Sequence, residues 1–324
     1  MFAAYVNSFS SDSPVDGLVL GERPDPVAPT GWTVVTVKAA SLNHHDLWSL
    51  RGVGLREESL PMILGCDAAG HDANGDPVIV HAVISDPSWT GDETMDPKRS
   101  LLSEVYDGTL ADKIAIPERN VVPKPQGLSF EEAACLPTAW LTAYRMLFTQ
   151  ADLNPGDTVL IQGAGGGVAT AAITLARAAG LRVYATSRDE SKRAKALEIG
   201  AHDVFEHGAR LPRRVDAVME TVGAATWSHS IKSLRPGGTI VMCGATSGFT
   251  PERGELNRIF ALQLRVHGST MGTKGELAAL ADFMDVTGVR PLIDRVLPME
   301  KADEGLAAMD EGRVFGKIVV TAGP

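Results

Sequence analysis

One segment of the chain combines residue types and spacing that suit the binding of a phosphate group. Residues 159–180 read VLIQGAGGGVATAAITLARAAG, an apolar run that leads through glycines into an alanine-rich stretch. A strand followed by a glycine turn and a helix directs the N–H groups and the positive end of the helix dipole at an anion. We therefore predict a site for a dinucleotide pyrophosphate, formed by Gly163, Ala164, Gly165, Gly166, Gly167 and Val168.

The small residues of this turn have separate roles. Gly163 allows the tight turn, Gly166 lets the backbone approach a phosphate, and Ala169 lets the helix pack closely on the strand. Because no Gly-Lys-Ser/Thr closes the motif, it is not the phosphate loop of nucleoside triphosphatases. A purely structural turn is the alternative that the glycines alone leave open.

The end of the next expected strand indicates which dinucleotide fits. Residues 181–195 read LRVYATSRDESKRAK. A carboxylate there would bind the ribose hydroxyls of NAD, whereas the 2′-phosphate of NADP needs hydroxyl and cationic donors. Ser187, Arg188 and Lys192 supply such donors, so we predict NADPH as the cofactor. Asp189 or Glu190 would favour NADH if the strand ended two residues later.

Strands and helices alternate around this turn, which predicts a parallel sheet with helices on both faces. The expected strands are DTVLIQG, LRVYATS, VDAVMETV and GGTIVMCGA, and the helices between the first three are VATAAITLARAAG and SKRAKALEIG. Upstream, Ser129 and Glu132 have the spacing of a capping box and begin a long helical pattern.

The first 125 residues differ from the rest in composition and pattern, since they are rich in Gly, Pro and Asp and contain short runs typical of β-strands. GWTVVTVKAAS, DPVIVHAVIS and ADKIAIP predict a twisted, largely antiparallel β domain. The helical segments KGELAALADFMDVTG and MEKADEGLAAMDEG and the strand GKIVVTAG are expected to return to it. The fold class is therefore α/β, with a β-rich domain at 1–125, a dinucleotide-binding domain at 126–266 and a return to the β-rich domain at 267–324.

Composition narrows the class of partner. The net charge of -10 argues against nucleic acid or an anionic membrane surface, because phosphate binding leaves a basic footprint. Cys66, Cys135 and Cys243 are too few and too scattered for a disulfide framework, which fits a reducing compartment. No apolar run is long enough to span a membrane, and the first residues lack a secretion signal. We expect a cytoplasmic enzyme with a small-molecule substrate.

Several motifs spread over nearly the whole chain carry a family resemblance. They are VKAASLNHHDLWSLRG, LPMILGCDAAG, YDGTLADKIAIPERNVVPKPQGLSFEEAACLPTAWLTAY, LRPGGTIVMCG and GKIVV. In order and spacing, and with the glycine turn, they resemble the medium-chain dehydrogenase/reductase superfamily, and within it the quinone oxidoreductase-like group. The resemblance implies a GroES-like, β-rich catalytic domain made from both chain ends, a Rossmann domain with a doubly wound parallel sheet, and a homodimer formed by the edges of the Rossmann sheets.

The zinc-dependent members of this family carry ligands that are replaced here. By resemblance, Asn43 stands where they have a ligand cysteine, and Gly65-Cys66-Asp67 stands where they have Gly-His-Glu. The third ligand position falls on Thr138. A catalytic zinc needs three protein ligands and an open position. We therefore predict no metal at this site.

A different metal site is the alternative that the residue types leave open. Cys66, Asp67 and one of His44 or His45 are acceptable ligands for a transition metal. If this segment is a strand, adjacent side chains point to opposite faces, so only one of the two histidines can enter the site.

The family also implies which residues lie near the nicotinamide. Cys243 and Gly244 follow a strand of the parallel sheet, and Gly244 is the expected contact through its backbone. Met271 and Gly272, in HGSTMGTK, are expected to lie near the carboxamide through their main chain.

Two readings of function follow. The first is a zinc-independent, NADPH-dependent reductase of a quinone, an enone or a similar small carbonyl compound. Its candidate catalytic residues are Asn43 and His45, as donors to the substrate oxygen, with Asp46 as an orienter of the histidine or a helix cap. The second is an alcohol dehydrogenase with unusual metal ligands, or a binding protein of the same fold that has lost turnover.

Overall fold

The computed structural model describes residues 1–323, which form two compact units. The first unit contains Met1–Leu141 and the chain from Met271 onward, and the second contains Thr142–Thr270. Residues 126–141, which the sequence placed in the dinucleotide-binding domain, lie in the first unit. Each unit is described by itself below.

The first unit is built on β-sheets. Its largest sheet has the order β10 (Val121–Pro123), β6 (Pro77–Val80), β5 (Ala68–His71), β3 (Trp32–Ser41), β18 (Lys317–Thr321), β17 (Ile293–Pro298), with β9 (Lys113–Pro117) also paired to β3. Smaller sheets consist of β2 (Leu18–Glu22), β1 (Phe2–Val6) and β4 (Met62–Ile63), and of β7 (Val83–Ile84) and β8 (Ser100–Leu101). All these pairs are antiparallel except β17 with β18, which confirms the largely antiparallel domain.

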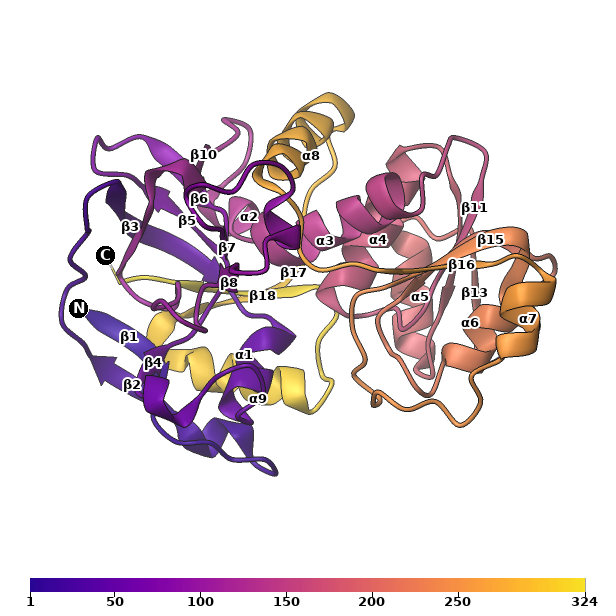
Figure 1. Cartoon of the computed structure of the whole chain (residues 1–324), viewed down its shortest axis with the longest axis horizontal. Helices are drawn as coiled ribbons and strands as arrows, with labels where there is room; N and C mark the ends of the chain where they lie inside the picture. Colours follow the sequence, from indigo (N-terminus) through magenta and orange to yellow (C-terminus); the bar gives the residue numbers. More distant parts are fainter. Residues whose placement is uncertain (324) are drawn as a thin grey trace. The chain divides into compact units, whose positions relative to one another are not determined.

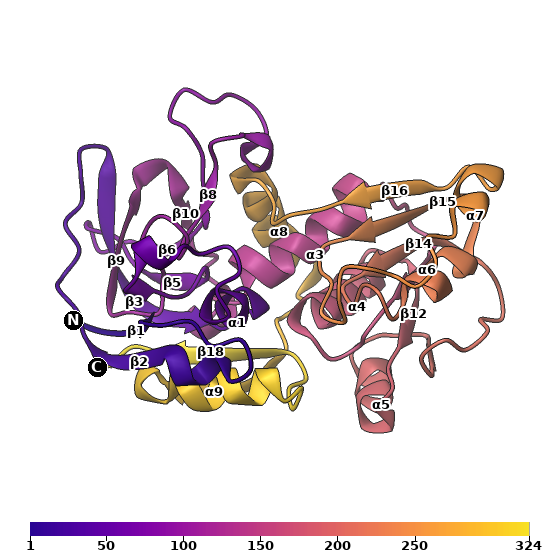
Figure 2. The ribbon, with the colours of Figure 1, turned by 60° about the horizontal axis from the view of Figure 1, so that its bottom comes forward.

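The two ends of the chain meet in this unit. Strand β18 pairs antiparallel with β3, so that Val320 lies opposite Ala40. Figure 1 shows this yellow C-terminal strand among the indigo and violet strands of the N-terminal part. Helix α9 (Ala302–Asp310) lies beside α1 (His44–Leu50), and Figure 2 shows both near β18. The expected return of the chain is therefore observed, and it brings Lys317 next to β3.

The core of this unit joins residues from both chain ends. Leu42, Leu47 and Leu64 from the N-terminal part pack in one cluster with Leu306 and Ile318 from the C-terminal part. Each is at most 2% exposed. Burying a leucine or isoleucine side chain contributes about 1.5 to 3 kcal/mol relative to leaving it exposed. The cluster thereby holds the start of α1 and the start of β18 together.

The predicted helical segments of the first unit begin where expected, whereas α1 was not predicted. Helix α2 (Phe130–Ala133) starts with the Ser129–Glu132 capping box. The helical segment continues through π-helical stretches and α3 (Leu141–Tyr144) to Gln150, and from Thr142 onward it belongs to the second unit. Helix α8 (Lys274–Thr287) has its own capping box and ends at Gly288 in the left-handed conformation.

The second unit has a parallel sheet with the strand order of a Rossmann fold. The order is β13 (Asp203–Phe205), β12 (Arg182–Thr186), β11 (Thr158–Ile161), β14 (Val215–Glu220), β15 (Leu234–Met242), β16 (Arg265–Gly268). Its helices are α4 (Gly167–Ala178), α5 (Glu190–Glu198), α6 (Trp227–Ser233) and α7 (Leu256–Ala261). The predicted strands and helices are confirmed, while the sequence analysis missed the strands β13 and β16 and the helices α6 and α7. Among residues 1–323, no helix is long and apolar enough to cross a membrane.

Candidate active site

The glycine turn lies between the end of β11 and the start of α4. Gly163 and Gly165 have φ of 73° and 135°, values that side chains with a Cβ rarely adopt. A Cβ on Gly163 would lie 2.6 Å from Cγ2 of Val222. Gly166 is exposed and forms the N-cap of α4, where the first N–H groups of the helix have no intrahelical partner. The turn thus has the geometry of an anion site.

A lysine lies over this turn. A Cβ on Gly165 would be 2.9 Å from Cδ and 3.4 Å from Nζ of Lys192, so the ammonium group is close to the glycine backbone. Lys192 belongs to α5, one strand and one helix further along the chain. The glycine turn therefore combines an ammonium group, backbone N–H groups and a helix N-terminus. Each of these groups stabilises a bound phosphate.

A buried hydrogen-bond network connects the strands that precede and flank the glycine turn. The hydroxyl of Thr186 donates to Oε1 of Gln162 at 2.5 Å, and the amide of Gln162 donates to the hydroxyl of Ser230 at 2.9 Å. That hydroxyl donates to Glu220 at 2.5 Å. All four side chains are at most 2% exposed. Because every link is satisfied, the network fixes the ends of β11, β12 and β14 against one another.

The strand that precedes Arg188 ends earlier than an NAD site would need. Strand β12 ends at Thr186, and Ser187 and Arg188 follow directly. The carboxylate of Asp189 accepts from the N–H groups of Ser191 at 2.8 Å and Lys192 at 3.3 Å, which caps α5. Asp189 is therefore the N-cap of α5. It does not lie at the end of β12, where a carboxylate that binds the ribose hydroxyls of NAD was expected.

The segment SLNHHD of the first unit starts a helix. Asn43 is the N-cap of α1, and its N–H donates to Asp46 Oδ2 at 2.8 Å. The other oxygen of Asp46 accepts from the N–H of Gly65 at 3.0 Å. Asp46 thus completes the capping box of α1, and it also ties α1 to the loop before β5; burial raises its pKa. Since His44 and His45 lie on a helix, the strand argument about them was wrong, although His44 is indeed exposed while His45 is partly buried.

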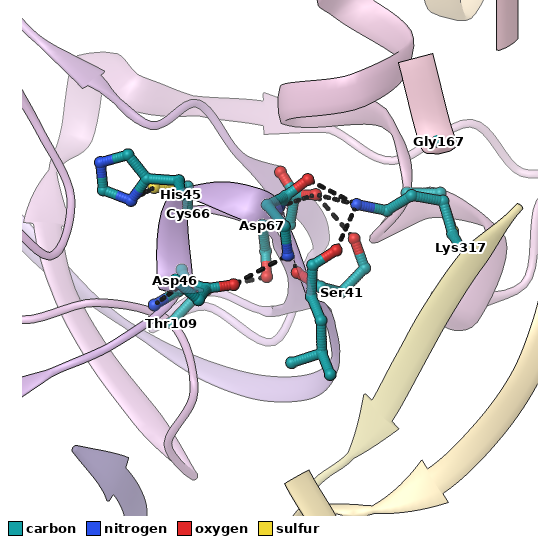
Figure 3. Close-up of polar contacts among 12 residues, drawn as sticks. Ser41, His45, Asp46, Cys66, Asp67, Thr109, Gly167 and Lys317 are labelled. Atoms are coloured by element: carbon teal, nitrogen blue, oxygen red, sulfur yellow. Dashed lines mark hydrogen bonds and ion pairs between the residues drawn. The ribbon is translucent and has the colours of Figure 1, made fainter. Parts of the chain in front are cut away.

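A buried ion pair fills the space beside Asn43. Nζ of Lys317 donates to Asn43 Oδ1 at 2.6 Å and to the carbonyl of Leu42 at 2.7 Å, and lies 3.3 Å from Asp67 Oδ2. The same oxygen of Asp67 accepts from Ser41 at 2.6 Å and from the amide of Asn43 at 2.8 Å. The side chains of Lys317 and Asp67 are 3% and 0% exposed. Figure 3 shows the lysine pointing at Asp67.

This network changes the expectation for Asn43. One N–H of its amide donates to Asp67 and the other contacts the carbonyl of Ser41 at 3.2 Å, while its oxygen accepts from Lys317. Because all hydrogen-bonding groups of the amide are used within the chain, Asn43 has no donor left for a substrate oxygen. It is therefore better described as a residue that holds the Lys317–Asp67 pair at the start of α1.

His45 lies in a second cluster on the other side of Cys66 (Figure 3). Nε2 of His45 is 3.2 Å from Glu104 Oε1, and Nδ1 is 3.4 Å from the hydroxyl of Ser103 and 3.6 Å from Sγ of Cys66. The side chain of His45 remains 21% exposed. Burial lowers the pKa of His45, but the neighbouring Cys66 and Glu104 outweigh burial and raise it well above its ordinary value.

The residues expected near the nicotinamide are distributed over both units. Cys243 and Gly244 follow the carboxyl end of β15, and burial raises the pKa of the Cys243 thiol to about 12. Met271 and Gly272 belong to the first unit. Met271 has a left-handed backbone with φ of 52°, and the carbonyl of Gly272 lies 2.9 Å from Nε2 of the buried His81. Burial lowers the pKa of His81, so the neutral ring donates this hydrogen bond.

Comparisons with known proteins agree with this architecture. A crystal structure of an NAD-dependent alcohol dehydrogenase is 33% identical, covers 100% of both chains and superimposes with a TM-score of 0.91. The chain belongs to the medium-chain dehydrogenase/reductase superfamily. Family models describe residues 29–126 of this dehydrogenase/reductase as an alcohol dehydrogenase GroES-like domain and residues 167–285 as a zinc-binding dehydrogenase.

Two further relatives of this dehydrogenase/reductase are named for enoyl-CoA chemistry. An acryloyl-coenzyme A reductase of Sulfurisphaera tokodaii is 29% identical over 95% of this chain and 97% of its own length. The crotonyl-CoA carboxylase/reductase AntE, whose structure was solved in complex with NADP, has 25% sequence identity to this chain and superimposes on it with a TM-score of 0.89. It covers 99% of this chain and 94% of its own chain.

The donor set of this dehydrogenase/reductase does not fit a zinc ion in the positions of its zinc-dependent relatives. The amide of Asn43 is hydrogen-bonded to Lys317 and Asp67, and the side chain of Thr138 has only a hydroxyl group. Cys66 offers a thiol, but burial raises its pKa, whereas zinc binds the thiolate. Within residues 1–323, no three His, Cys, Asp or Glu side chains are grouped to hold a metal ion.

Sequence reasoning missed three residues of this dehydrogenase/reductase that contact the candidate site residues His45 and Asn43. Ser103 and Glu104 contact His45 but follow a polar loop that has no motif. Lys317 lies far along the chain, in the segment GKIVV. Its only signal was a single lysine at the start of an otherwise apolar strand, which is a position that requires a buried partner.

Proposed function

We propose that this protein is an NADPH-dependent reductase that transfers hydride to a conjugated carbonyl compound without the help of a metal. The observation that supports it is the occurrence in one chain of a phosphate-binding turn with Lys192 beside it and of an imidazole, His45, held by a carboxylate. When bound, NADPH supplies the hydride. Oxidation of NADPH with a panel of quinones, enones and enoyl thioesters tests the proposal.

The chain's own residues bind the cofactor and stabilise charge. The backbone of Gly163, Ala164, Gly165, Gly166, Gly167 and Val168, with Lys192, would hold the pyrophosphate. In the second unit, the backbone of Gly244 would lie along the nicotinamide. His45 would donate a hydrogen bond to the substrate oxygen, because its ring is held by Glu104 at 3.2 Å and remains 21% exposed. As hydride reaches the electrophilic carbon, the electron pair of the double bond moves to this oxygen.

The substrate class rests on two arguments. A site that meets the developing charge with an imidazole suits a substrate whose charge is delocalised, as in the enolate formed from an enone or enoyl thioester, or the anion formed from a quinone. Relatives named as acryloyl-CoA and crotonyl-CoA reductases act on compounds of the conjugated thioester class. We propose conjugated carbonyl compounds as the class, with quinones and enoyl thioesters as its two test groups.

We expect NADPH to bind more tightly than NADH, through Ser187 and Arg188. Arg188→Ala should weaken NADPH binding by about tenfold to a hundredfold, because a hydrogen bond to a charged group contributes about 1.5 to 3 kcal/mol. The affinity of the Arg188→Ala variant for NADH should hardly change. Arg182→Ala, which removes another exposed arginine of the same region, is the matched control. Equal losses for both cofactors in Arg188→Ala would show that other residues select the cofactor.

An alcohol dehydrogenase is the second candidate, and the 33% identity to an NAD-dependent alcohol dehydrogenase favours it. That reading requires metal ligands other than those of the zinc-dependent relatives, with Cys66 and Asp67 among them. Elemental analysis of the purified protein separates the two. About one zinc per chain, lost together with activity on Cys66→Ser, would support the alcohol dehydrogenase.

We also propose a homodimer through the edge of the Rossmann sheet. Strand β16 is the last strand in the sheet order, and Val266 on it is 46% exposed. Phe260, in the preceding α7, is 75% exposed. An open edge with apolar side chains invites pairing with a second copy. A molar mass of one chain by light scattering would exclude this dimer.

A further inference from the structure

A buried carboxylate lies at the carboxyl end of β14, in the second unit. Glu220 is the last residue of this strand, and its side chain is 0% exposed. Its Oε1 accepts hydrogen bonds from the N–H groups of Val222 and Gly223 at 2.8 Å and 3.0 Å. The hydroxyl of Thr226 also donates to Oε1, at 2.7 Å, and that of Ser230 donates to Oε2 at 2.5 Å. Glu220 therefore fixes the backbone that follows β14 through hydrogen bonds rather than through a cation.

The turn that Glu220 holds lies between two other loops at the same edge of the parallel sheet. On one side, Cγ2 of Val222 is 2.6 Å from a Cβ built on Gly163, so Val222 contacts the glycine turn directly. On the other side, the carbonyl of Val222 accepts from the N–H of Ser247 at 2.8 Å and from its hydroxyl at 2.7 Å. A Cβ on Gly223 would be 2.7 Å from Cα of Ala245. The turn after β14 thus separates the glycine turn from the loop after β15.

We propose that Glu220 is a positioning residue of the cofactor site, which sets the spacing between the glycine turn and the loop after β15 and thereby the affinity for NADPH. The proposal rests on the proposed function, in which the glycine turn holds the pyrophosphate and the backbone of Gly244 lies along the nicotinamide. Glu220 does not touch the cofactor. It acts through the backbone of Val222 and Gly223, and all these residues belong to the second unit.

The hydrogen-bond inventory shows why a carboxylate is needed at this position. Glutamine has nearly the same shape but only one acceptor oxygen. If that oxygen replaces Oε2, the N–H groups of Val222 and Gly223 face an amide nitrogen and lose their acceptor. If it replaces Oε1, the hydroxyl of Ser230 receives donors from both position 220 and Gln162 and has no acceptor for its own proton. Gln162 directly precedes Gly163, so either orientation perturbs a neighbour of the glycine turn.

The test is the affinity for NADPH, measured by fluorescence titration of the full-length protein. Glu220→Gln should weaken NADPH binding by about tenfold or more, the effect of losing one hydrogen bond to a charged group. Asp216→Asn is the matched control, because Asp216 lies on the same strand about 13 Å away, at the opposite edge of the sheet. Its carboxylate accepts from the N–H of Thr158 at 2.7 Å and from Arg235 at 2.5 Å. Asp216→Asn should lower stability and leave the affinity for NADPH close to that of the parent protein.

A smaller ligand separates positioning from a general loosening of the second unit. Adenosine 2′-monophosphate lacks the pyrophosphate and the nicotinamide, so Glu220→Gln should bind it as tightly as the parent protein does. An equal loss for this ligand and for NADPH, or a loss for NADPH no larger than in Asp216→Asn, would overturn the proposal.

A double-mutant cycle tests whether Glu220 acts through the turn. Val222→Ala removes the methyl group that faces Gly163 and should itself weaken NADPH binding. Glu220→Gln should then cost less in the Val222→Ala background than in the parent protein, because coupled residues are not additive. If circular dichroism shows that Glu220→Gln does not fold, Val222→Ala alone decides, and an affinity equal to that of the parent protein would refute the proposal. Since affinity is measured without turnover, inactivity toward every substrate would refute only the proposed reductase function.

Discussion

His45→Ala should lower kcat for every accepted substrate by about 100- to 1,000-fold, the usual loss when one donor to a developing oxyanion is removed. The affinity for NADPH should stay close to that of the parent protein, because the residues proposed to bind its phosphates belong to the other unit. The measurement combines steady-state turnover with cofactor binding followed by NADPH fluorescence.

His207→Ala is the matched control, since it removes an exposed imidazole. It should change neither quantity. If His45→Ala turns over all substrates at the parent rate, the substrate oxygen is stabilised by another group. The fold and the cofactor assignment would be unaffected by that result.

Lys317→Met should lower the free energy of unfolding by about 3 to 5 kcal/mol, the typical loss when one partner of a buried ion pair is removed. Its ammonium is the cation that faces Asp67, and it also bonds Asn43 and the carbonyl of Leu42. Methionine fills a similar volume but leaves the carboxylate buried beside an amide and a hydroxyl. Urea unfolding at neutral pH measures the difference.

Two further variants define the cause of this loss. Lys301→Met breaks an ion pair with Glu304 in which both side chains are more than half exposed, so little change is expected. The double variant Lys317→Met/Asp67→Asn removes both charges and should regain part of the stability. A double variant that is less stable than Lys317→Met alone would show that packing, and not the unpaired charge, causes the loss.

Local patterns predicted most of the fold. The strand, glycine turn and helix at residues 159–180 and the capping box at Ser129 depend on neighbours within a few residues, and the structure has them where expected. Strand β16 was missed because RVHG is short, and its strand conformation depends on pairing with β15, which is a non-local contact. The domain boundary within residues 126–150 was missed because the helical pattern continues across it.

The candidate site was less predictable because its contacts are distant in sequence. Asn43 was identified by its position, but its amide oxygen accepts a hydrogen bond from Lys317, 274 residues further along the chain. His45 was identified as a candidate, yet its hydrogen-bond partner is Glu104 and not Asp46, because the side chain of Asp46 completes the capping box with Asn43. No spacing rule connects a histidine in a helix start with a glutamate after a polar loop.

The central claim is that hydride passes from NADPH to the electrophilic carbon of a conjugated carbonyl compound. The most direct test uses NADPH with deuterium at both C4 positions of the nicotinamide, with an enone and an enoyl thioester as substrates and mass spectrometry and NMR of the products. We expect one deuterium per product molecule, located at the carbon β to the carbonyl group, with the proton at the α carbon derived from water. A product without deuterium, or no reduction of any quinone, enone or enoyl thioester in the presence of tightly bound NADPH, would contradict the account.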